Sequence, residues 1–213
     1  MEMSQLVLDL QDRSTVKVRK AAKLLRKYPQ EGMCSLLVEA YKREIQHNKS
    51  WETQNELIAT AGILGCRDFI PFLEKICQKN ELHDMITINA GLSYVRLSRK
   101  DMSDVSPIFK YMNGVNYSLG HGFLYALGFD NMVPNIKDQA KLISKFHNFG
   151  YDRDSSGYSD PRYGLAAASA GWDFDTVKDF LSQCMIDGDE FSKFVAESSL
   201  KRKYVKQHRL SPY

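Results

Sequence analysis

Nearly every stretch of this chain repeats its apolar residues with the period of an α-helix, which leaves little room for other structure. In residues 16–28, apolar side chains recur three or four positions apart, and four lysines take the opposite side. Period-two alternation flanked by turn signals is absent, so the predicted fold is all-α. Further helices are expected over residues 33–45, 51–65, 68–77, 83–98, 104–112, 117–129, 134–148, 161–172, 174–186 and 189–207.

Several of these helices carry recognisable start and stop signals. Ser14 or Thr15 is a suitable N-cap for the helix that follows. Gly65 stands where a helix C-terminus favours glycine, and Pro71 falls in a first turn, where proline is tolerated.

Small residues recur near the ends of alternate helices. They occur as AGILG (61–65), AGLSY (90–94), YALGF (125–129) and AAASAGW (166–172). A short connection and another amphipathic helix follow each segment, at the spacing of about 30 to 40 residues that helix-pair repeats show. Small residues allow paired helices to approach closely, and each pair has an apolar face that it buries only by stacking on the next pair.

Two stretches resemble HEAT repeats. ATAGILGCRDFIPFLEKIC (59–77) has their Leu-Gly helix end and an Ile-Pro opening, and DRSTVKVRKAAKLLRKY (12–28) has their Val-Arg-x-Ala-Ala pattern. The resemblance covers residues 12–190 and is strongest in the first pairs. It implies a right-handed α-solenoid of about five helix pairs, which we expect to form one domain over 1–213. The residues themselves add an acidic loop over 150–160, longer than such a repeat needs, and a basic capping helix over 189–207. Proteins of this class are mostly binding surfaces, so the resemblance implies a fold and not an activity.

Cellular location is inferred from the cysteines and the N-terminus. Cys34, Cys66, Cys77 and Cys184 form no Cys-x-x-Cys pair, which favours buried free thiols in a reducing compartment. The N-terminus lacks the basic start and long apolar core of a secretory signal. No apolar run approaches the roughly 20 residues of a membrane helix. We therefore expect a cytoplasmic protein that does not contact a membrane.

Motifs for ordinary catalysis are not found. The histidines do not fall at the i, i+4 spacing of a metal-binding helix, and neither a nucleophile elbow nor a phosphate-binding loop occurs. His121 lies between Gly120 and Gly122, which we interpret as residues that loosen a helix start. The sequence thus predicts a protein that is not an enzyme, with no catalytic residue, metal site or cofactor.

The stretch YDRDSSGYSDPRYGLAAASAGWDFD (151–175) is the best candidate site. Carboxylates with tyrosines on an exposed loop are typical of a protein-binding surface. The predicted partner-binding residues are Tyr151, Asp152, Asp154, Tyr158, Asp160, Tyr163, Trp172, Asp173 and Asp175. The same residues also have structural roles open to them: Asp160 as the cap of one helix, Asp173 or Asp175 as the cap of the next, and Trp172 as filler between them.

Charge is distributed unevenly along the chain. Residues 151–190 carry nine acidic and three basic side chains, whereas residues 191–213 carry six basic and one acidic. Clustered cations beside an aromatic ring suit nucleic acid, and a solvated helix face is the alternative. The residues that would contact phosphates are Lys201, Arg202, Lys203, Lys206 and Arg209. The lysine side of residues 17–27 is interpreted as the outer side of an amphipathic helix.

Two functions follow as hypotheses. The first is a protein-binding module, most concretely a bacterial immunity protein whose acidic surface steers it to a basic toxin or nuclease. The alternative is a nucleic-acid-binding protein that resembles the HEAT-like alkylpurine DNA glycosylases, with roles for Trp51, Trp172 and Asp173.

Overall fold

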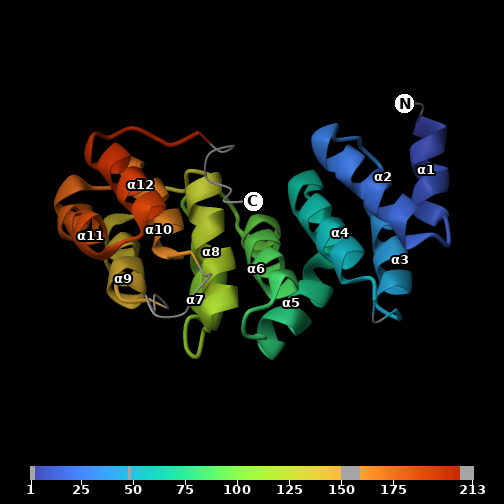
Figure 1. The fold of residues 1–213 in the computed structure, drawn as a ribbon, viewed down its shortest axis with the longest axis horizontal. Coiled ribbons are helices and arrows are strands. Elements are labelled where there is room, and N and C mark those ends of the chain that lie inside the picture. Colours follow the sequence, from blue (N-terminus) through green and yellow to red (C-terminus); the bar gives the residue numbers. More distant parts are fainter. Residues whose placement is uncertain (1–2, 48, 150–158, 207–213) are drawn as a thin grey trace.

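The computed structural model describes residues 3–47, 49–149 and 159–206. These residues form α-helices and two short 3-10 helices with no strand among them, which confirms the predicted all-α fold (Figure 1). The first six α-helices are α1 (Met3–Gln11), α2 (Thr15–Lys27), α3 (Cys34–Glu44), α4 (Trp51–Leu64), α5 (Ile70–Lys79) and α6 (Met85–Ser98). The next six are α7 (Ser106–Tyr111), α8 (Tyr117–Phe129), α9 (Ile136–Phe146), α10 (Arg162–Ala168), α11 (Phe174–Asp187) and α12 (Glu190–Leu200). The 3-10 helices are η1 (Arg67–Phe69) and η2 (Ser169–Gly171).

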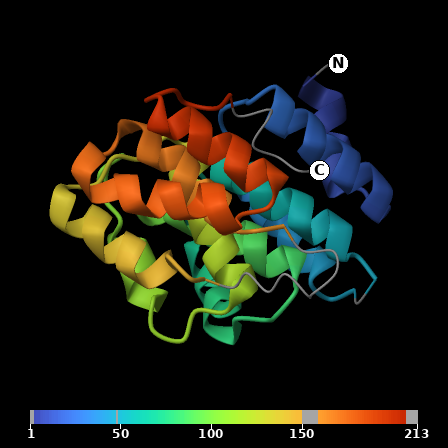
Figure 2. The same ribbon diagram turned by 60° about the vertical axis from the view of Figure 1, so that its left-hand side comes forward.

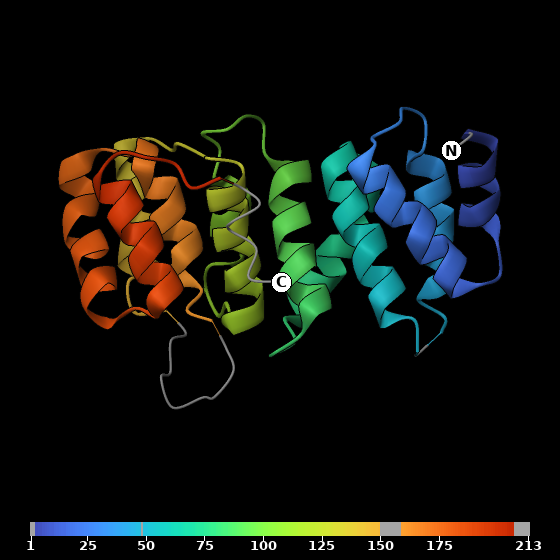
Figure 3. The same cartoon turned by 45° about the horizontal axis from the view of Figure 1, so that its top comes forward.

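The even-numbered helices form one continuous row. Each of α2, α4, α6, α8 and α10 packs on the next even-numbered helix, and α12 completes the row (Figure 3). Hydrogen bonds cross the row between residues 34 or 35 positions apart: the Asn89 amide donates to Asn55 Oδ1 at 2.8 Å, and Ser93 Oγ donates to the Ile58 carbonyl at 3.0 Å. This spacing falls within the predicted range of 30 to 40 residues.

The odd-numbered helices lie alongside this row. Helices α1, α3, α5 and α11 pack on α2, α4, α6 and α12 respectively. The middle of the chain is less regular, since α7 also packs on α6, and α9 packs on α11. The buried apolar side chains of the two sets of helices form one continuous core.

Glycines set the distance between α6, α8 and α10. A Cβ atom on Gly122 of α8 would lie 2.1 Å from the Ile88 carbonyl oxygen of α6. On Gly164 of α10 it would lie 2.4 Å from the Leu124 carbonyl oxygen of α8. The small residues do allow close helix approach, as predicted. The interpretation of Gly120 and Gly122 as loosening a helix start was wrong, because both are buried inside α8.

Most predicted helix bounds hold within a few residues, and one prediction fails. Helix α1 was not predicted, because its buried residues in the described ranges, Leu6 and Leu10, are too few to establish a helical pattern. The basic helix predicted over 189–207 ends at Leu200. Arg202 then adopts a left-handed backbone with φ of 59°, and its guanidinium donates to the Trp172 carbonyl, so the chain turns back across the row.

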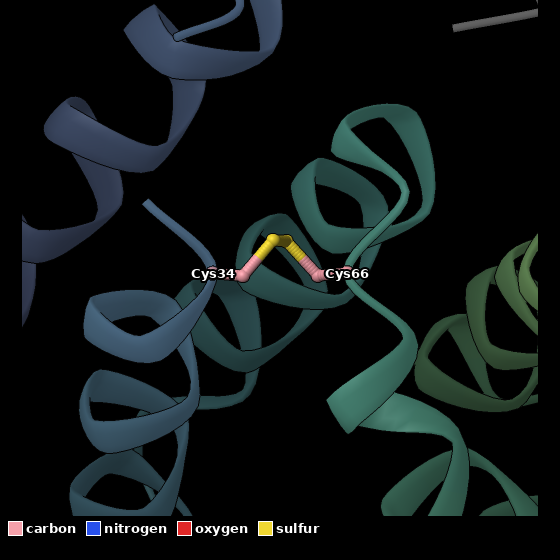
Figure 4. Close-up of a disulfide and its surroundings, with 2 residues drawn as sticks. All are labelled: Cys34 and Cys66. Atoms are coloured by element: carbon pink, nitrogen blue, oxygen red, sulfur yellow. A yellow bond between two sulfur atoms is a disulfide. The ribbon is translucent and has the colours of Figure 1, made fainter. Parts of the chain in front are cut away.

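Cys34 and Cys66 form a disulfide that joins the start of α3 to the turn after α4 (Figure 4). Only Cys77 and Cys184 are free thiols, and both are buried. The prediction of four free thiols was therefore wrong, because spacing along the chain does not show which cysteines meet in space. Disulfides persist mainly in oxidising compartments, so the cysteines no longer support the predicted cytoplasmic location.

Within the described ranges, no helix combines the length and the apolar character needed to cross a bilayer.

Candidate binding surfaces

The structure divides the predicted partner-binding stretch into buried and exposed parts. Tyr151, Asp152, Asp154 and Tyr158 lie outside the described residues. Asp160, Tyr163 and Trp172 are each 0% exposed. A side chain without exposed surface contributes no contact area to a partner, so the prediction of a docking role is wrong for these three residues.

Asp160 is buried because it pairs with a neighbour in the chain. Both of its carboxylate oxygens accept hydrogen bonds from Arg162, with the shortest at 2.6 Å from Nη2. Arg162 is itself buried and also reaches Asp187 at 2.9 Å. Asp160 Oδ1 further accepts from the backbone N–H of Arg162, which fits the alternative role at the start of a helix. A buried charge pair of this kind orders the chain where α10 begins.

Tyr163 and Trp172 belong to the core. The Trp172 indole N–H donates to the Met132 carbonyl at 2.7 Å, which satisfies its only polar group and seats the ring beside α8. The Tyr163 ring packs edge-on against His121, at 5.7 Å between centroids, and against Phe191, at 4.9 Å. The alternative interpretation of Trp172 as filler between helices is confirmed.

Among the described residues of the predicted site, Asp173 and Asp175 are the ones that solvent reaches. Asp173 caps α11, because its side chain accepts from the Thr176 backbone N–H at 2.9 Å. Asp175 is exposed on α11, and this helix lies at the end of the molecule opposite α1 (Figure 2). We call the exposed side of α11 the α11 face. The α11 face consists of Phe174, Asp175, Lys178, Asp179, Ser182 and Ile186. Each of these side chains has another of the set three or four residues away, so they share one side of the helix.

The α11 face combines carboxylates with apolar side chains in water. Ile186 is 72% exposed and Phe174 is 39% exposed, at opposite ends of the stripe. Asp175 and Asp179 stand between them, with Lys178 as the single cation. Apolar anchors with orienting charges are the composition of a protein-binding surface.

His121 is a buried titratable group in the middle of the row. It is 2% exposed on α8, and its Nε2 lies 3.5 Å from the Tyr163 hydroxyl. Its Nδ1 has no hydrogen-bond partner within the described structure. The rings of Tyr117 and Tyr125 also contact it, so a positive charge would be poorly solvated there. Burial lowers the pKa of His121 to about 4.

This shift predicts a loss of stability in mild acid. The folded protein holds His121 neutral down to about pH 4, whereas the unfolded chain protonates it near pH 6.5. The free energy of unfolding should therefore fall by about 3 kcal/mol between those pH values because of His121 alone. Urea unfolding at a series of pH values should show a shallower decline for His121→Phe than for wild type. The exposed His47→Gln is the control, and a His121→Phe slope equal to wild type would contradict the assignment.

A groove opens on the other half of the molecule, where α2 faces α4. It has a volume of about 920 Å³, and we call it the α2–α4 groove. Its lining residues are Arg19, Lys20, Lys23, Trp51, Glu52, Asn55, Glu56 and Met85. Trp51 is 51% exposed in the first turn of α4, in contrast to the fully buried Trp172.

Charges in the α2–α4 groove are only partly paired. Arg19 forms an ion pair with Glu52, and Arg26 Nε lies 2.8 Å from Glu56 Oε1. Lys20 and Lys23 are exposed and form no ion pair within the part of the chain described here. The lysine side of α2 does face solvent as predicted, but it also forms one wall of this groove. Sequence reasoning missed the groove, for which the only signal was a tryptophan at a polar helix start.

The basic residues at the C-terminal end are partly used within the fold. Lys201 Nζ lies 2.5 Å from Glu197, and Arg202 donates to the Trp172 carbonyl. Lys203 and Lys206 are exposed, and Arg209 lies outside the described residues. Within the described ranges, Lys201, Arg202, Lys203 and Lys206 follow α12 and do not share a helical face, which weakens the case for an array of phosphate contacts.

Comparisons of the chain with protein-family models, with curated proteins and with solved structures found no match.

Proposed function

We propose that this chain is a non-enzymatic protein-binding module. Its two sets of helices would be a right-handed α-solenoid of about five helix pairs that resembles HEAT repeats. Close packing of α6, α8 and α10 on glycines gives a stiff scaffold, which presents surfaces without rearranging.

The α11 face is the observation on which this proposal rests. Ile186 is 72% exposed at one end of the α11 face and Phe174 is 39% exposed at the other, with Asp175 and Asp179 between them. When a partner covers an exposed apolar side chain, its surface is removed from water, which is favourable, and it adds contact area to the interface.

In its most concrete form, the proposal is an inhibitor of immunity-protein type. The carboxylates of the α11 face would steer a basic toxin or nuclease to the surface, and Phe174 and Ile186 would then make the close contacts. The nucleic-acid alternative stays a prediction, and the salt dependence of any DNA affinity tests it.

Capture of a partner by affinity-tagged protein tests the proposal. A variant with Phe174, Asp175, Asp179 and Ile186 all changed to alanine should hold the captured partner at least about tenfold more weakly. The matched control changes four other exposed residues to alanine, two acidic and two apolar: Glu31, Asp68, Leu82 and Met102. The control should bind as wild type does. Equal capture by all three proteins would contradict the proposal.

A further inference from the structure

A second exposed surface lies at the opposite end of the even-numbered row. The α2–α4 groove presents Trp51, of which half is exposed, with Met85 from α6 also in its lining. Large apolar side chains in a groove of about 920 Å³ provide the buried centre that peptide-binding sites use. Tryptophan, methionine and arginine are also the residue types that are enriched in protein interfaces.

The unpaired lysines define the charge of the occupant. Lys20 and Lys23 stand one helical turn apart on the α2 wall, and no carboxylate of the described structure pairs with them. The Glu52 and Glu56 carboxylates are already occupied by Arg19 and Arg26. The surplus charge of the groove is therefore positive, and a complementary occupant brings acidic groups to Lys20 and Lys23.

A protein segment suits this groove better than a nucleic acid does. Glu52 is 55% exposed in the lining and pairs with Arg19, so a carboxylate interrupts the row of cations that a continuous phosphate backbone would need. A peptide places its carboxylates one at a time, so it can pair with the lysines and avoid the glutamates. Asn55 also lines the groove, and its amide oxygen accepts from Asn89, which holds the amide in one orientation.

We propose that the α2–α4 groove binds an acidic protein segment that carries one large apolar or aromatic residue. The apolar residue packs against Trp51 and Met85, and its acidic neighbours pair with Lys20 and Lys23. This surface is separate from the α11 face and of opposite charge, so the module would engage two different partners or two regions of one partner. The inference does not depend on the α11 face, and either surface can fail without the other.

Selection from a displayed library of random 16-residue peptides tests this inference on the full-length protein. The selected sequences should be rich in Asp and Glu around one apolar or aromatic residue. Binding of a synthetic selected peptide should alter the tryptophan fluorescence, and the change reports Trp51 because Trp172 is fully buried. The double variant Lys20→Glu and Lys23→Glu should bind this peptide at least about tenfold more weakly, as should Trp51→Ala.

The controls separate the groove from general charge effects. Lys137→Glu with Lys145→Glu makes the same change of charge on exposed lysines of α9 and should leave peptide affinity unchanged. Circular dichroism should show that all variants are folded. Failure to select acidic peptides, or unchanged binding by the Lys20/Lys23 variant, would overturn the inference. So would quenching of Trp51 by a thymidine 20-mer with a steep salt dependence, which would make the groove a nucleic-acid surface.

Discussion

Gly122→Ala should destabilise the protein by about 3 kcal/mol, although alanine is the better helix former. The added methyl group would lie 2.1 Å from the Ile88 carbonyl oxygen and 3.0 Å from the Leu92 backbone nitrogen, both on α6. These are backbone atoms, so the clash is relieved only if α8 moves away from α6. Chemical denaturation monitored by circular dichroism measures the loss directly.

Ser182→Ala on the solvent side of α11 is the control for this substitution. It also places an alanine on a helix, but at an exposed position. The free energy of unfolding should therefore change by no more than about 0.5 kcal/mol. If Gly122→Ala were as stable as Ser182→Ala, α6 and α8 would not pack as closely as described.

Loss of the Cys34–Cys66 disulfide is expected to have an effect of similar size. The bridge spans a sequence separation of 32 residues, and a cross-link of that span stabilises a fold by about 3 kcal/mol, chiefly by restricting the unfolded chain. The double variant Cys34→Ala and Cys66→Ala should therefore unfold at lower denaturant concentration than the oxidised wild type.

Reduction provides the control for the disulfide. Dithiothreitol should lower the stability of wild type towards that of the double variant and leave the variant unchanged. Thiol titration of unfolded, unreduced protein should find only Cys77 and Cys184. Four reactive thiols in protein alkylated inside its own cells would contradict the disulfide and restore the argument for a reducing compartment.

The helices could be predicted from the sequence wherever local signals agree. Asp173 caps α11 as expected, and Gly65 ends α4 in the left-handed conformation with φ of 73°. The end of α12 could not be predicted, because it depends on a contact between Arg202 and the Trp172 carbonyl, 30 residues away. Pairing of Cys34 with Cys66 depends in the same way on how α3 and α4 pack.

The candidate site was harder to predict than the fold. A charged residue in a polar stretch suggests exposure, but Asp160 is buried because Arg162 neutralises it. Conversely, the spacing of the lysines in α2 is typical of a solvated helix face. Only the packing of α2 against α4 shows that Lys20 and Lys23 border a groove with Trp51.

The two proposed surfaces lie at opposite ends of the row and differ in charge. The α2–α4 groove at one end of the row has surplus positive charge, and the α11 face at the other end carries Asp175 and Asp179. If both surfaces bind as proposed, long-range steering brings differently charged partners to different ends of the row.

Site-specific photo-crosslinking tests the central claim, that the α11 face docks a partner protein. A photoreactive amino acid would replace Ser182 in the middle of the α11 face, and Lys137 on α9 as the control, in protein produced in its native cells. We expect one discrete crosslinked protein from position 182 and none from position 137, with loss of the product when Ile186 is also changed to alanine. Absence of a product at 182, or the same products at both positions, would contradict the account.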